Sequence, residues 1–136
     1  MKITLDNYFR AYADHPEITD EIRENAETLL GRVDLLLDEC VSMGWEPHIN
    51  PATGTYISGQ DNGGWRPQAC PIGAPNSSHK TGAGVDVADA DGSLDAMITD
   101  DLLARHGLYR ESPDFTNGWV HLTTRPPKSG RRTFIP

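Results

Sequence analysis

Residues 77–86 read SSHKTGAGVD, and in this stretch a glycine-containing loop leads into a short apolar strand. His79 and Asp86 stand seven positions apart, with two glycines between them. Asp86 lies between two valines, where a carboxylate is costly to bury unless it pairs with a cation or a metal. The stretch therefore predicts a buried acidic group and a nearby histidine at the point where a strand begins.

A second strand of the same character is expected at residues 119–124. His121 stands there between two apolar residues, and the alternation of strand side chains puts it on the opposite face from them. If the two strands are neighbours, His79, Asp86 and His121 converge as two nitrogens and one oxygen around zinc, with a fourth position open. The spacing alone leaves an alternative, since strand histidines and aspartates are commonly hydrogen-bonded residues that hold no metal.

The N-terminal third of the chain predicts helices. Thr4 can cap a short helix that stops near His15 and Pro16. Thr19 caps a long second helix, and Gly44 supplies its C-terminal stop. Apolar residues recur along this second helix at spacings of three and four, which favours a helix strongly. They are Ile18, Ile22, Ala26, Leu29, Leu30, Val33, Leu36, Leu37, Cys40 and Val41.

Short strands and loops are expected after Gly44, because twelve of the 13 glycines lie from there onward. Helices followed by interleaved strands predict an α+β fold. The expected elements are one or two short strands at 46–48 and 55–58, a long irregular loop at 62–84, a strand at 85–87, a helix between Ser93 and Gly107, the strand at 119–124 and a last strand at 132–135.

Length and charge limit the functions that the chain can have. Its 136 residues, 37% of them hydrophobic, suffice for a single domain over 1–136 and are too few for two. The net charge of -8 argues against nucleic acid as a partner. The basic segment 115–136 is interrupted by prolines and ends on apolar residues, so we expect it to pack and dock rather than to bind nucleic acid. The distribution of hydrophobic residues along the chain predicts neither an export signal nor a membrane span.

The sequence leaves open whether the two cysteines form a disulfide. Cys40 and Cys70 match no metal-ligand spacing, and either buried thiols or one disulfide would be consistent with them. Cys40 lies at the apolar face of the long helix, as a plain core thiol would.

Residues 77–86 resemble the S-x-H-x-x-G-x-A-x-D signature of the zinc D-alanyl-D-alanine carboxypeptidases. That family also includes vancomycin-resistance dipeptidases and phage L-alanyl-D-glutamate endopeptidases, which share the hedgehog/DD-peptidase fold. Its second element, a tryptophan shortly before a strand histidine, is similar to residues 118–121 (GWVH). Its third element is similar to residues 58–59 (SG) followed, after a short insertion, by 65–67 (WRP). The resemblance extends roughly from Ile18 to the C-terminus.

The resemblance implies a fold and a set of site residues. N-terminal helices would pack on a small, mainly antiparallel sheet, with His79, Asp86 and His121 as the ligands of Zn²⁺. Ser77 would fix the loop by hydrogen bonding, or would be an ordinary turn serine. Arg66 would meet a carbonyl or carboxylate of the substrate, because a guanidinium offers a fixed fork to such groups. An exposed loop arginine is the alternative for Arg66.

One position departs from the family. The family places a catalytic glutamate about three residues before the second histidine, where this chain has Gly118. A glycine cannot carry a proton. The nearest carboxylates are Asp114 and Glu111, seven and ten residues before His121 on a segment that looks like a loop. Either could fold back over the metal, and Glu111 is favoured for its longer reach; otherwise both are solvated loop acids.

Two functions follow from the resemblance. The first is a zinc-dependent metallopeptidase that hydrolyses an amide bond in the stem peptide of bacterial peptidoglycan. The second keeps fold and metal without catalysis, as a cell-wall-binding or virion structural module. With no signal peptide in the pattern, the expected protein is made in the cytoplasm and reaches the cell wall as a phage lysis protein (an endolysin) or a virion component.

Overall fold

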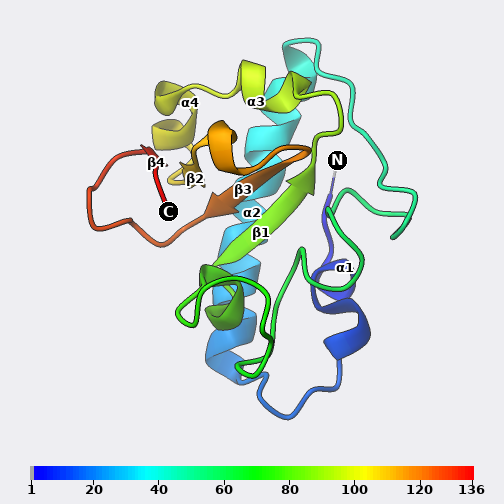
Figure 1. Ribbon diagram of the computed structural model, residues 1–136. Helices are drawn as coiled ribbons and strands as arrows, with labels where there is room; N and C mark the ends of the chain where they lie inside the picture. Colours follow the sequence, from blue (N-terminus) through cyan, green and yellow to red (C-terminus); the bar gives the residue numbers. More distant parts are fainter. Residues whose placement is uncertain (1) are drawn as a thin grey trace.

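Two helical segments open the computed structural model, which describes residues 2–136 (Figure 1). The short helix α1 (Leu5–Phe9) runs into a 3-10 helix η1 (Arg10–Tyr12), and the long helix α2 (Asp20–Ser42) follows. Thr4 Oγ1 accepts a hydrogen bond from the Asn7 amide, and Thr19 Oγ1 accepts one from the Ile22 amide. Both predicted caps are confirmed, because each threonine satisfies an amide that has no partner within its helix.

The sheet is small and mixed. Its four strands lie in the order β1-β3-β2-β4, with β1 at Gly84–Ala88, β3 at Trp119–Thr123, β2 at Tyr109–Glu111 and β4 at Thr133–Phe134. The β1–β3 and β2–β3 pairs are antiparallel, and the β2–β4 pair is parallel. The predicted α+β class is confirmed.

One face of the sheet packs on α2, which lies behind β1 and β3 in Figure 1. Val85 and Val87 of β1 and Val120 and Leu122 of β3 are fully buried in the same cluster as the apolar stripe of α2. Burial of such side chains is the main source of stability, at about 1.5–3 kcal/mol each. The opposite face of β1 and β3 is left to carry Asp86 and His121. Among residues 2–136, no helix has the length and apolarity needed to cross a membrane.

Helix α1 holds the long loop at 62–84 through two hydrogen bonds of Tyr8. Tyr8 donates a hydrogen bond from its hydroxyl to the Gly84 carbonyl (2.8 Å), and its own carbonyl accepts one from the Trp65 amide (3.1 Å). A Cβ at Gly64 would collide with the Tyr8 carbonyl, so this position needs glycine. Within the loop, residues 78–81 form the 3-10 helix η2 (Ser78–Thr81).

Residues 46–48 and 55–58 do not form the predicted strands. The structure has isolated bridges there, Asn50 with Thr55 and Ile57 with Val87. The Asn50 side-chain amide donates to the carbonyls of Ile57 (2.9 Å) and Gly59 (2.7 Å), which holds the segment as a compact loop.

The helix predicted between Ser93 and Gly107 is two helices, α3 (Ser93–Met97) and α4 (Asp100–Arg105). Thr99 interrupts them by adopting an extended backbone and capping α4 through the Leu102 amide. Ser93 does not cap α3, because it is the first residue of the helix and Gly92 occupies the cap position. Buried Asp89 instead accepts hydrogen bonds from the amides of Leu94 (3.0 Å) and Asp95 (2.9 Å).

The basic C-terminal segment is tied to the sheet. Arg110 donates its amide to the Arg132 carbonyl (2.8 Å), and Ser112 donates its amide to the Phe134 carbonyl (2.7 Å). These bonds make β4 an edge strand beside β2, which agrees with the expectation that the segment packs.

Candidate metal centre

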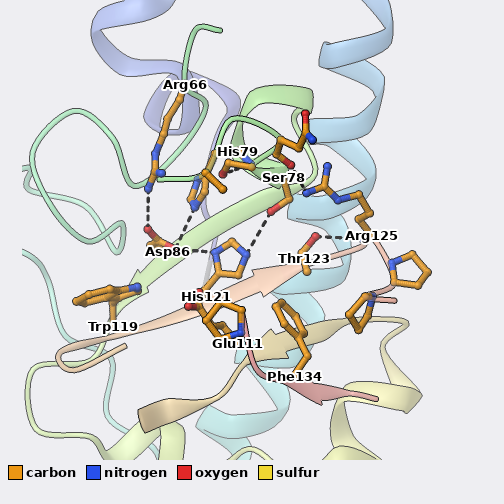
Figure 2. Close-up of a pocket in the computed structure, with 16 residues that line it drawn as sticks. Arg66, Ser78, His79, Asp86, Glu111, Trp119, His121, Thr123, Arg125 and Phe134 are labelled. Carbon is orange, nitrogen blue, oxygen red and sulfur yellow. Dashed lines mark hydrogen bonds and ion pairs between the residues drawn. The ribbon is translucent and has the colours of Figure 1, made fainter. Parts of the chain in front are cut away.

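The register of the sheet aligns three polar side chains across three strands. Asp86 on β1 lies opposite His121 on β3. On the other side of β3, Arg110 of β2 lies opposite Leu122, so one further step in the antiparallel register sets Glu111 opposite His121. Opposed residues of paired strands point to the same face. Asp86, His121 and Glu111 therefore form a row on the face that does not pack on α2 (Figure 2).

His79 reaches this row from the 3-10 helix η2. Ser77 begins η2 by accepting a hydrogen bond at Oγ from the His79 amide (3.3 Å), a contact consistent both with a serine that fixes the loop and with an ordinary turn serine. Gly82 ends η2 in the left-handed conformation (φ 81°), and an added Cβ there would lie 2.5 Å from the Ile22 carbonyl oxygen of α2. A side chain at Gly82 would be strained and would push η2 away from α2.

The two predicted histidine ligands converge on one oxygen of the third predicted ligand, Asp86. His79 Nε2 lies 3.2 Å from Asp86 Oδ1, and His121 Nδ1 lies 2.9 Å from the same atom. The ligand atoms of the three residues all lie within 4.8 Å of one another, and all three residues are buried. Two imidazoles and one carboxylate on a rigid sheet are a donor set that suits a metal ion, and the cluster could hold one.

The hydrogen bond on the far side of the His79 ring tests this fit. His79 Nδ1 lies 2.7 Å from the Gly64 carbonyl, which can only accept, so Nδ1 carries the proton. The neutral ring then presents a lone pair at Nε2 to the ionised Asp86 carboxylate. Two acceptors 3.2 Å apart need a cation or a second proton between them. A carbonyl that orients a histidine in this way is the usual outer partner of a metal-bound imidazole.

The acid and the histidine both have lowered pKa values. Burial by itself raises the pKa of Asp86, but its contacts with His79 and His121 outweigh burial and hold that pKa well below its ordinary value. Burial lowers the pKa of His79, against the opposing charge of Asp86. An ionised carboxylate beside a neutral imidazole is the protonation state that metal ligation requires.

A serine that sequence reasoning missed supports His121. Ser78 Oγ lies 3.2 Å from His121 Nε2, the ring nitrogen that points away from Asp86. A Cβ at Gly84 would collide with Ser78 Oγ, so the small residue at 84 leaves room for this contact. Ser78 lies one position from the motif serine, and only its burial could have singled it out.

Arg66 is buried and pairs with Asp86, so the alternative of an exposed loop arginine is wrong. Its Nη2 lies 3.3 Å from Asp86 Oδ2, its Nε donates to the Asn62 carbonyl (2.7 Å), and its Nη1 donates to the Ile72 carbonyl (3.2 Å). A Cβ at Gly73 would collide with the guanidinium. Arg66 thus balances the charge of Asp86 and links the loop to the site.

Glu111 lies on strand β2 and not on the expected loop. It lines a pocket of about 400 Å³ together with His79, Asp86 and His121. Burial raises the pKa of the Glu111 carboxyl above its ordinary value; His121 opposes this, and Asp86 adds to it. A half-buried carboxyl with a raised pKa beside the cluster is suited to carrying a proton.

Asp114 and Gly118 lie outside this pocket. Asp114 is exposed in the short 3-10 helix η3 (Pro113–Phe115) and is not among the residues that line the pocket. Gly118 adopts a φ of 95°, and a Cβ there would enter open space. Of the two acids considered as proton carriers, the structure brings only Glu111 to the cluster.

The cysteines are both free, with Cys40 buried in the core and Cys70 half-buried. Neither belongs to the cluster of possible metal ligands among the described residues.

Comparisons of the chain with protein-family models, with curated proteins and with solved structures give no match.

Proposed function

We propose that this protein is a zinc-dependent peptidase of the D-alanyl-D-alanine carboxypeptidase and phage endopeptidase family, with the hedgehog/DD-peptidase fold. The observation that carries the proposal is the convergence of His79 Nε2 and His121 Nδ1 on Asp86 Oδ1 at the floor of an open pocket. These are the residues that the family resemblance names as zinc ligands.

The side chains present fit zinc. Two imidazoles and a carboxylate supply three ligands, and the pocket above them leaves space for water or substrate. When bound, zinc would polarise a scissile carbonyl and lower the pKa of water. The Gly64 carbonyl and Ser78 hydroxyl hold the two histidine rings in orientation.

Glu111 is the proton carrier in this proposal. Its carboxylate takes a proton from the attacking water and gives it to the leaving nitrogen. It does so from the strand next to His121, and therefore replaces the family glutamate at the position of Gly118. A rigid strand holds such a group in position better than a loop does.

Arg66 supports the site through Asp86. All three of its side-chain nitrogens have protein partners, so it orients the Asp86 carboxylate and supplies positive charge at the pocket wall. That charge favours a substrate carbonyl or carboxylate in the pocket. The proposed substrate is the stem peptide of bacterial peptidoglycan, and the proposed setting is a phage lysis or virion protein acting at the cell wall.

A second function has one observation in its favour. The Gly118 position opens into space and offers no carboxylate, which favours a zinc-stabilised cell-wall-binding or virion module without catalysis. The position of Glu111 on β2, where it lines the pocket, favours the peptidase.

The proposal is tested by incubating the zinc-loaded protein with purified peptidoglycan and analysing released fragments by mass spectrometry. The peptidase predicts cleavage products of the stem peptide, either a released terminal residue or a new amino terminus within the peptide, and their formation should stop in Glu111→Gln. Cell-wall binding without any cleavage product would favour the second function and contradict the first.

A further inference from the structure

A second hollow adjoins the candidate metal pocket. It has a volume of about 410 Å³ and is bounded on its outer side by the loop 58–63. Arg66, Asp86 and Trp119 line both hollows, so the two meet directly beside the ligand cluster. In Figure 2, Arg66 and Trp119 lie on one side of this cluster and Arg125 lies on the other.

The wall of the second hollow is fixed to the edge of the sheet. The Asp86 amide donates to the Gly63 carbonyl (2.8 Å), and the Ser58 amide donates to the Asp86 carbonyl (2.9 Å). Asp86 therefore anchors the loop 58–63 through its backbone while its side chain belongs to the ligand cluster. This coupling makes the second hollow a fixed part of the site.

Exposed residues line both ends of the combined groove. Gln60 and Asp61 are exposed at the end formed by the loop 58–63, and Arg125 and Pro126 are exposed at the other end. The buried cation Arg66 lies at the junction and not at a blind end. A site that removes a terminal residue needs an end that stops the chain, and the geometry of this groove lacks one.

The two ends carry opposite charge. Arg125 holds its guanidinium at one end by donating from Nη2 to the Asn76 carbonyl (2.5 Å), and within residues 2–136 the other two guanidinium nitrogens have no hydrogen-bond partner. Asp61 supplies a carboxylate at the other end. Such ends complement an extended peptide that carries both a carboxylate and an amine.

We propose that the groove binds a peptide on both sides of the scissile amide, and that the protein is an endopeptidase and not a carboxypeptidase. This inference rests on the proposed peptidase function and adds the position of the cut. In the reaction one water is consumed: its OH joins the carbonyl carbon, the C–N bond breaks, and its hydrogen goes to the leaving nitrogen. Each of the two products is itself a peptide.

The test uses one stem tetrapeptide, L-Ala-γ-D-Glu-L-Lys-D-Ala, in two forms, made also with meso-diaminopimelate in place of lysine. One form has free termini, and the other is N-acetylated and C-terminally amidated. We expect hydrolysis of an internal amide in both forms, with kcat/KM values within about threefold of each other. Loss of the terminal D-Ala from the free form alone would overturn the endopeptidase inference and leave the peptidase proposal standing. Failure to hydrolyse any of these peptides or peptidoglycan would overturn both.

A binding measurement tests the groove without turnover. In a Glu111→Gln background, Kd for the doubly blocked peptide is measured by calorimetry. Adding Arg125→Gln or Asp61→Asn should weaken binding about threefold to tenfold each, because each removes a charge at one end. Lys128→Gln and Asp101→Asn are matched controls, since both residues are exposed outside the two hollows. A loss of affinity at Arg125 alone, with Asp61→Asn equal to its control, would contradict binding on both sides.

Discussion

Asp86 and His121 lie opposite each other in the antiparallel register of β1 and β3, with His121 Nδ1 2.9 Å from Asp86 Oδ1. The pairing is set by the backbone of the sheet, and the apolar residues on either side of each fix which face they occupy. A slip of one residue in either strand would turn the ligand of that strand toward α2. The same residues that build the core thus determine the geometry of the candidate metal centre.

Replacing Glu111 should remove activity and leave the metal in place. Glu111→Gln keeps the size of the side chain and loses its ability to take a proton, so kcat/KM should fall about 10²–10⁴-fold. Zinc content should equal that of the parent, because Glu111 is not among the three ligands. Asp114→Asn is the matched control and should stay within about threefold of the parent. Parental hydrolysis rates in Glu111→Gln would remove it from the mechanism.

Removing zinc should loosen η2 before it affects α2. His79 is held on one side by the Gly64 carbonyl and on the other by the cluster, whereas α2 is held by apolar packing. After chelation, amide hydrogen exchange should accelerate at residues 78–84, with α2 still protected. Equal acceleration in both elements would show that the metal supports the whole fold.

Asp89 should be important for stability although it lies outside the site. Its buried carboxylate accepts two amide hydrogen bonds at the start of α3. Asp89→Ala leaves both amides without this partner, so the free energy of unfolding should fall by about 1–3 kcal/mol. Denaturant unfolding measures this, with exposed Asp14→Ala as a control that should change it by less than about 0.5 kcal/mol. A loss no larger than that of the control would rule out the cap.

Asp95 should make stability depend on pH. Burial, helped by the nearby Asp89, raises the pKa of Asp95 to about 6, while Arg110 opposes the shift. Between its unfolded value near 4 and this folded value, the folded state binds more protons than the unfolded state. The contribution of Asp95 to stability is therefore largest below pH 4 and declines as the pH rises to 6.

Asp95→Asn removes this contribution. The unfolding free energy of the variant, minus that of the parent, should rise between pH 4 and 6 and stay level above. Taking the difference also cancels the contribution of Asp86, whose depressed pKa gives stability that is present above pH 4 and is lost as the pH falls below it. A difference that is flat across this range would show that Asp95 titrates normally.

The candidate ligands could be predicted because their signal is local. His79 and Asp86 occur in one ten-residue stretch, and the alternation around His121 identifies its face. The long helix was equally accessible, since its stripe of apolar residues repeats over six turns. Ser78 was not, because its contact with His121 joins positions 43 residues apart.

Strand β2 was missed because its three residues carry no pattern of their own. Tyr109–Glu111 lies between the stop at Gly107 and the turn at Ser112, and it becomes a strand by pairing with β3 and β4. The reverse error occurred at 55–58, where β-branched residues suggested a strand but tertiary contacts made a loop. The break at Thr99 had a signal, a threonine before two aspartates, which is a typical helix start.

Zinc content measured by elemental analysis tests the account most directly. The purified parent, loaded with zinc and dialysed, should hold one zinc ion per chain, and His121→Ala should hold none, because it loses one of three ligands. His48→Ala is the matched control: His48 pairs with Asp91 away from the cluster, and this variant should keep its zinc. Full zinc occupancy in His121→Ala, or no zinc in the parent, would contradict the account.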